Sequence, residues 1–324
     1  MKSVLVTGGA GYIGSHTVKE LRRKGWSVVV FDNLSSGRRE FAAGAELAVG
    51  DLRDPQSVRS VLAGRRFAAV LHFASLIQVG ESYADPRTYY EHNLTTSLNL
   101  LGAMLDAGVK AFIFSSTAAV YGVPETIPIP EDHPLRPVNP YGQTKAVVES
   151  VLRDYDRAFG LRFVSLRYFN ASGADPDGDL GECHDPETHL IPNALLAALG
   201  RRPALDIFGT DFPTPDGTAV RDYIHVSDLA SAHVLALDHL LSGGASQAVN
   251  LGTNRGYSVR EVLTRAEAVT GLRIPRADKP RREGDVPVLL ASSAKAEKLL
   301  GWTRRWSDLD TILATAWAWH RKRL

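Results

Sequence analysis

A glycine-rich turn between an apolar run and an amphipathic segment constrains the fold more than any other feature of this chain. In "SVLVTGGAGYIGSH", glycines at positions 9, 11 and 14 follow the spacing G-x-G-x-x-G, and a further glycine stands at position 8. Glycine here lets the amides at a helix start approach a pyrophosphate that side chains would otherwise block. The pattern predicts a strand, a turn and a helix that bind a dinucleotide; a tight turn without a ligand is the alternative.

An aspartate at the end of the next apolar run indicates which dinucleotide is bound. Asp32 closes "SVVVFD" about 20 residues after the glycines, where a carboxylate accepts hydrogen bonds from the ribose hydroxyls of adenosine. The same carboxylate would repel the 2′-phosphate of NADP, so NAD is favoured. Arg38 and Arg39 follow shortly after and keep NADP as the alternative. Asp51 and Leu52, after a third apolar run, are expected near the adenine.

Apolar runs alternate with helix-like segments through the first half of the chain. Strands are expected at "SVLVT", "SVVVF", "AELAV", "AAVLHFA", "AFIFSS" and "RFVSLRYF", with helices over 12–24, up to about 107, and over 141–159. Continuous apolar strands separated by helices are typical of a parallel sheet covered on both faces. The fold class predicted is therefore α/β, a doubly wound parallel sheet of the Rossmann type.

The composition and the pattern of elements in the chain change after about residue 170. Long loops rich in glycine, proline and aspartate alternate with short helical segments over 191–199 and 226–241. Loops of this length in a compact chain are usually functional. We expect an NAD-binding domain over 1–170, to which some later segments return, and a smaller C-terminal α/β lobe over 171–324 that binds the substrate.

Composition and charge narrow the function classes. The net charge is +1 and no block of basic residues occurs, so neither nucleic acid nor a membrane surface is an expected partner. No run of about 18 apolar residues predicts a membrane span. Cys183 is the single cysteine, which precludes an intrachain disulfide and favours a reducing compartment, the cytoplasm.

Sequence spacing predicts no metal site. The run Asp175, Asp177 and Asp179 resembles the start of a calcium loop, but Leu180 replaces the required glycine and Pro186 the closing glutamate. The histidines show neither His-x-x-x-His nor paired-cysteine spacing. Each is expected to be structural or on the surface.

The stretch "NPYGQTK" places a tyrosine and a lysine four residues apart. Asn139 can cap a helix and Pro140 suits its first position, so Tyr141 and Lys145 share one helix face. A free tyrosine has a pKa of about 10, and ionising it at neutral pH requires about 4 kcal/mol. The ammonium group, the helix N-terminus and a positive nicotinamide can supply this. Such a pair is often accidental, but beside an NAD fingerprint it indicates catalysis.

A run of hydroxyls follows the apolar segment "AFIF". Ser115, Ser116 and Thr117 lie where the carboxyl edge of the sheet is expected, and open α/β sheets bind their ligands at this edge. Turn amides are the alternative partners of these hydroxyls. We expect Thr117 to orient the substrate hydroxyl.

Taken together, the motifs resemble those of the UDP-glucose 4-epimerases, extended short-chain dehydrogenases. The resemblance covers "TGGAGYIGSH", "FDNLSSG", "HFASLIQVGES", "FSSTAAVYG", "NPYGQTK", "LRYFN", "GTAVRDYIHVSDLA", "NLGT" and "PRREGDVP", from the first strand to about Ala291. It implies a catalytic triad of Thr117, Tyr141 and Lys145, and a homodimer formed by the helices around 93–107 and 141–159.

The resemblance also implies the binding residues. Those implied for NAD are Gly8, Gly11, Tyr12, Ile13, Gly14, Asp32, Asn33, Asp51, Leu52, Phe73, Ala74, Asn93, Ser115, Tyr141, Lys145 and Tyr168. Those implied for the UDP-hexose are Thr117, Asn170, His189, Leu190, Phe208, Arg221, Arg282, Asp285 and Leu289. Two positions depart from the family pattern: Ile77 replaces a lysine that reaches the phosphates, and His189 replaces an asparagine. Arg221 and Arg282 are then expected to carry more of the diphosphate charge.

The expected reaction is interconversion of UDP-glucose and UDP-galactose by reversible oxidation at C4 through a 4-keto intermediate. A 4,6-dehydratase is disfavoured because Ala118 and Ala119 stand where its acid and base belong. A 4-epimerase of a UDP-pentose or UDP-N-acetylhexosamine remains an alternative. Leu289 is smaller than the family tyrosine associated with excluding the N-acetyl group, so partial turnover of UDP-N-acetylglucosamine is expected, although simple packing is an equal explanation. A non-catalytic NAD-binding scaffold is the alternative from another class.

Overall fold

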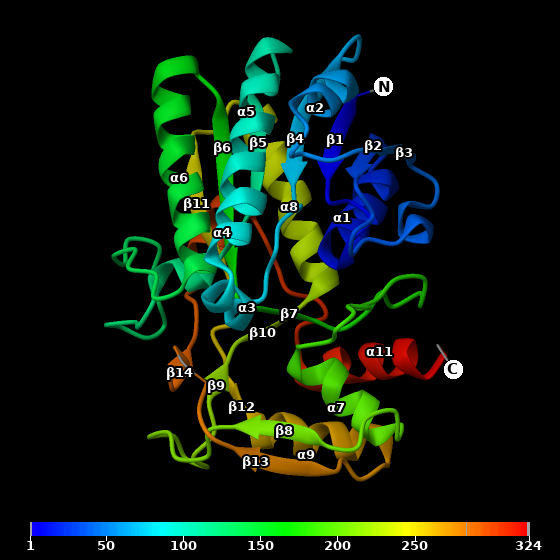
Figure 1. Cartoon of the computed structure of the whole chain (residues 1–324), viewed down its shortest axis with the longest axis vertical. Helices are drawn as coiled ribbons and strands as arrows, with labels where there is room; N and C mark the ends of the chain where they lie inside the picture. The colour runs from blue at the N-terminus through cyan, green and yellow to red at the C-terminus, as the bar shows by residue number, and fades with distance from the viewer. Residues whose placement is uncertain (1, 283, 323–324) are drawn as a thin grey trace.

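A seven-stranded parallel sheet organises the chain, whose computed structural model describes residues 2–282 and 284–322 (Figure 1). Its order is β11-β6-β5-β4-β1-β2-β3. The strands are β1 (Ser3–Thr7), β2 (Ser27–Asp32), β3 (Glu46–Val49), β4 (Phe67–His72), β5 (Ala111–Thr117), β6 (Arg162–Tyr168) and β11 (Gln247–Leu251). The order reverses between β1 and β4, which opens a crevice at the carboxyl ends of these strands. The predicted Rossmann-type fold is confirmed.

Helices cover both faces of the sheet because successive strand residues point to opposite sides. Val4 and Val6 of β1 pack with α1 (Tyr12–Arg23) and α8 (Val226–Leu241). Leu5, between them, packs in a second cluster with residues of the helices on the other face, which are α2 (Pro55–Leu62), α5 (Thr96–Asp106) and α6 (Pro140–Phe159). Both faces of the sheet are therefore buried.

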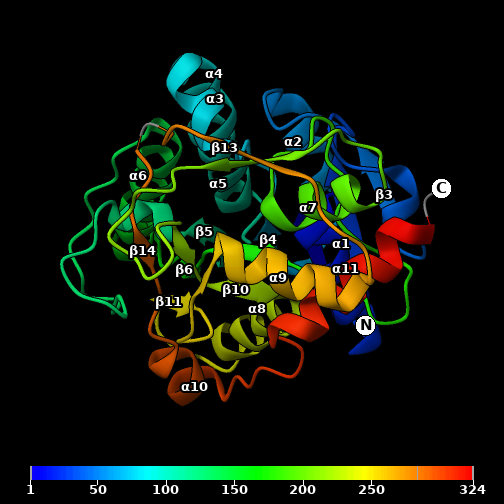
Figure 2. The same cartoon turned by 90° about the horizontal axis from the view of Figure 1, so that it is seen from below.

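A smaller lobe has its own apolar core below the sheet in Figure 1. Its core elements are α7 (Leu190–Ala198), β8 (Leu205–Phe208), β10 (Tyr223–His225), α9 (Val259–Thr270) and α11 (Leu309–Lys322), and β13 (Arg276–Lys279) pairs with β8. Figure 2 shows α7, α9 and α11 from below, in front of the sheet. Although β11 and α8 follow residue 170 in the chain, they belong to the sheet and its helical layer.

Short elements connect these layers. Between β4 and α6 lie α3 (Val79–Ala84), α4 (Pro86–Tyr89), a π-helical segment η2 (Tyr90–Thr95) and a 3-10 turn η3 (Ala118–Tyr121), and another 3-10 turn, η1 (Arg39–Ala42), precedes β3. The remainder are β7 (Asn170–Ser172), β9 (Val220–Arg221), β12 (Tyr257–Ser258), β14 (Val288–Leu289) and α10 (Ala294–Leu300). Within the described ranges, no helix combines the length and apolarity needed to cross a membrane.

A buried ion pair ties α6 to the centre of the sheet. Glu149 of α6 accepts a hydrogen bond from Arg167 Nε at 2.9 Å and another from Ser116 Oγ at 2.6 Å. Arg167 also donates to the hydroxyl of Tyr121 at 2.8 Å, and that hydroxyl donates to Asn250 of β11 at 2.6 Å. Burial lowers the pKa of Arg167, but the interactions with Glu149 outweigh burial and raise it. The network fixes α6 relative to β5, β6 and β11.

We predict that Glu149→Gln lowers the free energy of unfolding by about 3–5 kcal/mol, because it leaves the buried Arg167 guanidinium without its charged partner. Urea denaturation followed by circular dichroism measures this change. The control is Asp154→Asn on the same helix, whose exposed carboxylate lies 3.8 Å from Arg157. That pair should contribute less than about 0.5 kcal/mol. Equal stabilities of the two variants would contradict the structural role of the buried pair.

Candidate active site

The first turn of α6 positions Tyr141 and Lys145. Asn139 Oδ1 accepts a hydrogen bond from the amide of Gly142 at 2.7 Å, and Pro140 occupies the first helical position. This is the cap that the sequence predicts. One turn separates the two side chains, and Lys145 Nζ lies 6.0 Å from the centre of the Tyr141 ring. The tyrosine and the lysine therefore meet on one face of the helix.

Lys145 is almost fully buried, with 2% of its surface exposed. Its ammonium group donates to Ser75 Oγ at 2.9 Å and to the carbonyl oxygen of Ser115 at 3.0 Å. It also lies 4.9 Å from the centre of the Phe114 ring. Burial lowers the pKa of Lys145 to about 7, and the charge of Glu149 opposes this shift. The two hydrogen bonds thus hold the amine in place, while burial disfavours its charged form.

Burial shifts the pKa of the Tyr141 phenol in the opposite direction to that of the Lys145 amine. Burial raises the pKa of Tyr141 to about 12, and a hydrogen bond with Thr117 opposes the rise. Ionising this phenol at neutral pH therefore costs about 7 kcal/mol in the absence of further positive charge. A phenolate next to an ammonium group is net neutral, so the ion pair avoids much of the penalty that each lone charge carries. The two residues can therefore act together as an acid and base pair that accepts and returns a proton.

The glycine turn between β1 and α1 is shaped by close backbone contacts. Gly8 has φ of +73°, and a Cβ there would lie 2.4 Å from the amide nitrogen of Ala74. A Cβ on Gly14 would lie 2.2 Å from the carbonyl oxygen of Gly8. The first turn of α1, all of it described, carries no acidic side chain. The turn forms a cradle that a Cβ would fill, next to a helix N-terminus that favours an anion, so it fits a dinucleotide pyrophosphate.

Two carboxylates that the sequence predicts to lie near the adenosine of NAD are found beyond the glycine turn. Asp32 ends β2 and accepts hydrogen bonds from the amides of Ala10 at 3.0 Å and Leu34 at 2.8 Å. Burial raises the pKa of Asp32, and these amides oppose the rise. In the loop after β3, Asp51 accepts from Arg53 at 2.8 Å and from Asn33 at 3.0 Å, and the bonds from Arg53 lower its pKa. These interactions orient both carboxylates.

Several residues expected to contact NAD make contacts within the protein that stabilise the segments at the carboxyl ends of the strands. Asn93 Oδ1 accepts from the amide of Leu76 at 2.8 Å, and its Nδ2 donates to the carbonyl of Leu76 at 3.0 Å. The hydroxyls of Ser115 and Tyr168 hydrogen-bond to each other. Tyr12 donates to the carbonyl of Gly173, and the Phe73 ring lies at a tilt 4.7 Å from the His233 ring. The remaining residues pack in the two cores of the sheet: Ile13, Leu52 and Ala74.

The smaller lobe brings together four of the residues expected to bind the UDP-sugar. Arg221 lies 3.7 Å and Arg282 3.3 Å from the carboxylate of Asp285. The Arg282 guanidinium also lies 4.7 Å from the centre of the Phe208 ring. Burial lowers the pKa of Arg221, and Asp285 opposes this effect. The cluster offers two cations to an anionic ligand, partly balanced by one carboxylate.

The remaining substrate candidates lie on other elements. Leu289 of β14 is in register with Arg221 of β9 and packs beside Ala118 and its neighbours. Asn170 of β7 donates to the carbonyl of Asp222 at 2.9 Å. His189 and Leu190 stand at the start of α7, where the Nδ1 of His189 contacts Glu182 rather than the arginines.

Three residues that support the triad were not identified from the sequence. Ser75, which lies far from Lys145 in the chain, accepts a hydrogen bond from its amine, and Glu149, one turn later on α6, opposes the fall of its pKa. Gly142 allows α6 to approach η3, since a Cβ there would lie 2.6 Å from the carbonyl oxygen of Ala119. Its place next to Tyr141 in "NPYGQTK" was the available signal.

The fold and the site define a dinucleotide-binding α/β protein with a tyrosine and lysine pair at the carboxyl edge of its sheet. Residues 4–252 match the family described as "NAD dependent epimerase/dehydratase family". The chain is 53% identical over 321 residues to a UDP-glucose 4-epimerase of Rhizobium leguminosarum bv. trifolii, which covers 99% of this chain and 98% of that protein. The chain belongs to the NAD dependent epimerase/dehydratase family and, within it, to the UDP-glucose 4-epimerases.

Solved structures agree with this assignment. The UDP-glucose 4-epimerase from Brucella ovis in complex with NAD is 50% identical, with a TM-score of 0.95 over 98% of each chain. The UDP-glucose 4-epimerase from Bifidobacterium longum in complex with NAD+ and UDP is 41% identical, with a TM-score of 0.95 over 99% of this chain and 98% of that one.

We predict that Gly142→Ala lowers kcat by about 100-fold, because the added Cβ displaces the start of α6 and with it the Tyr141 hydroxyl. Steady-state kinetics measure the effect. The control is Gly80→Ala in α3, where a Cβ would meet no described atom within 4 Å. The control should retain normal turnover; normal turnover by Gly142→Ala as well would contradict the positioning argument.

Proposed function

We propose that this chain catalyses the NAD-dependent interconversion of UDP-glucose and UDP-galactose. The observation that carries the proposal is the buried amine of Lys145 one helical turn from the Tyr141 phenol, which hydrogen-bonds to Thr117. This group lies at the carboxyl edge of the sheet, to which the glycine turn also belongs. The names of its relatives support the same reaction.

The triad supplies the proton transfers at the sugar. NAD, when bound, supplies the acceptor and later the donor of the C4 hydride. Tyr141, ionised beside the Lys145 ammonium, removes the proton of the 4-hydroxyl, which leaves a 4-keto sugar after hydride loss. Thr117, which hydrogen-bonds to Tyr141, lies next to the proton acceptor and orients the sugar 4-hydroxyl. Tyr141 then returns the proton after the keto sugar has presented its other face.

The smaller lobe holds the nucleotide part of the substrate. Arg221 and Arg282 provide the positive charge for the diphosphate, and the Phe208 ring beside Arg282 offers an apolar surface. Ile77, 38% exposed, adds no cation where the family pattern has a lysine. Tight binding of UDP combined with a loose grip on the hexose lets the keto sugar turn within the site.

The alternatives meet specific obstacles in this chain. Elimination of water, as in a 4,6-dehydratase, needs an acid and a base beside Thr117, where Ala118 and Ala119 stand. The function of a non-catalytic scaffold does not require a buried lysine that is held by two hydrogen bonds beside a tyrosine. Epimerisation of other UDP-sugars uses the same triad and differs only in the shape of the sugar pocket.

We predict that Tyr141→Phe lowers kcat by about 10²–10⁴-fold because it removes the proton acceptor. Bound NAD should remain, since the phenyl ring preserves the packing of α6. The control is Tyr155→Phe on the same helix, which should keep normal turnover. Product analysis after incubation with UDP-galactose measures both variants, and undiminished conversion by Tyr141→Phe would exclude the proposed mechanism.

Leu289 supports a broader substrate range. A leucine in register with Arg221 leaves more room than a tyrosine, so we propose partial turnover of UDP-N-acetylglucosamine. We predict that Leu289→Tyr lowers kcat/KM for this sugar by about 10–200-fold while UDP-galactose conversion persists. A matched control is Leu289→Met, which conserves volume. If the unaltered protein converts UDP-galactose but none of the acetylated sugar, the proposed range is wrong.

We also propose a homodimer formed through α5 and α6. Leu98 of α5 is 38% exposed and Phe159, the last residue of α6, is 50% exposed, which leaves apolar surface at both helices. The single cysteine supports the proposed cytoplasmic location.

A further inference from the structure

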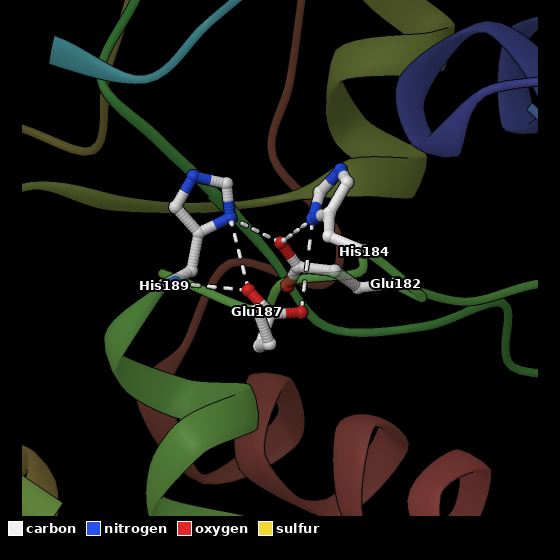
Figure 3. Close-up of side chains that lie close together, drawn as sticks. All are labelled: Glu182, His184, Glu187 and His189. Carbon is white, nitrogen blue, oxygen red and sulfur yellow. Dashed lines mark hydrogen bonds and ion pairs between the residues drawn. The ribbon is translucent and has the colours of Figure 1, made fainter. Parts of the chain in front are cut away.

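Two histidines and two glutamates converge in the segment between β7 and α7. Their potential ligand atoms, one from each of Glu182, His184, Glu187 and His189, lie within 4.8 Å of one another. Figure 3 shows the two imidazole rings on opposite sides of the two carboxylates, with one ring nitrogen of each directed toward them. The cluster spans only eight residues of chain, so its geometry is set locally.

The distances between these atoms lie both below and above those in the coordination shell of a small metal ion. His184 Nδ1 lies 3.2 Å from Glu182 Oε1 and 3.7 Å from Glu187 Oε2, and His189 Nδ1 lies 3.9 Å from Glu187 Oε1. His189 Nδ1 also contacts Glu182. Four ligands bound tetrahedrally at about 2.0–2.1 Å lie about 3.3 Å apart. The four atoms would have to shift toward that common separation, from distances of no more than 4.8 Å.

Burial and hydrogen bonding provide a second observation. The side chains of Glu182 and Glu187 are 3% and 8% exposed. His184 Nδ1 is buried and, among the described residues, has no partner with hydrogen-bond geometry although it faces both carboxylates. A dication would balance the two carboxylates and satisfy this nitrogen.

The competing occupants of the cluster are protons. Burial lowers the pKa of His184, but the nearby carboxylates of Glu182 and Glu187 outweigh burial and raise it to about 10. The pKa of His189 is raised by the same carboxylates, so without metal the cluster favours protonated imidazoles paired with carboxylates. A metal ion has to displace those protons, in exchange for bonds to four ligands.

We propose that Glu182, His184, Glu187 and His189 bind one divalent first-row transition metal ion, for which Zn²⁺ is the probe. Imidazole nitrogens favour such ions over Ca²⁺ and Mg²⁺, which prefer oxygen ligands alone. The proposal departs from the sequence-based expectation of no metal, and it does not depend on the proposed reaction.

A metal here would order the approach to α7. The ligand set ends at His189, directly before the first helical residue, Leu190. Figure 3 shows the second ring nitrogen of His189 pointing away from the carboxylates. Coordination through Nδ1 would fix that ring and leave Nε2 as a hydrogen-bond donor. The ion would thus be structural, with an effect on a residue expected to contact the substrate.

The test is Zn²⁺ binding by the tag-free, full-length protein after treatment with a chelator. Competition titration calorimetry should show one saturable equivalent of Zn²⁺ per chain. In thermal unfolding, Zn²⁺ should raise the melting temperature. His184→Gln and, separately, Glu187→Gln should each weaken binding by about 100-fold or more. The control is Asp177→Asn/Asp179→Asn, which alters the other acidic group, where Lys19 already contacts all three carboxylates at 2.7–3.0 Å. This control should bind Zn²⁺ as the unaltered protein does.

Co²⁺ provides a second measurement, because tetrahedral nitrogen and oxygen ligation gives visible absorption far more intense than that of octahedral hydrated Co²⁺. The unaltered protein should develop this absorption at one equivalent, and both single variants, checked by circular dichroism for folding, should lose it. Absence of saturable Zn²⁺ binding, or equal binding by His184→Gln and Glu187→Gln, would overturn the proposal and leave the cluster as an ion-pair network.

Discussion

The interaction on which this structure depends is the one between a buried amine and a phenol. Burial lowers the pKa of Lys145 to about 7 and raises that of Tyr141 to about 12, so each residue alone resists carrying charge. In the proposed mechanism, a phenolate at Tyr141 and an ammonium group at Lys145 are together net neutral, and a bound nicotinamide cation would favour that state further. The low polarity that opposes each single charge also strengthens their mutual attraction. The chemistry of the site follows from this balance.

The fold holds the pair rigidly because every contact comes from a regular element or its end. Lys145 bonds to a carbonyl of β5 and to Ser75 after β4, while the Asn139 cap and Gly142 set where α6 begins. One turn beyond Lys145, Glu149 anchors the helix to β6 through Arg167. The same helix thus carries the proposed proton acceptor Tyr141, its charge partner Lys145 and the anchoring residue Glu149.

The elements were predictable from sequence because apolar periodicity and glycine placement are local signals. The strand at 3–7 and the helix at 226–241 have the predicted bounds, and Asn139 caps α6 as expected. Long-range contacts leave no such signal, so the ion pair of Glu149 with Arg167 was not predicted. The cluster around His184 was also missed, because spacing rules for histidine describe helices and paired cysteines, whereas this cluster forms in a folded loop.

Ultraviolet difference titration of tyrosinate in the NAD⁺-loaded protein measures the ionisation of Tyr141 itself, with the spectrum of Tyr141→Phe subtracted to isolate one phenol. We expect the pKa of Tyr141 to lie near neutral pH when NAD⁺ is bound, well below the value of about 12 to which burial raises it without the cofactor. In Lys145→Met the titration should move to higher pH, because the ammonium charge that favours the phenolate is gone. A Tyr141 phenol that stays protonated throughout the neutral range, or that titrates identically without Lys145, would contradict the account.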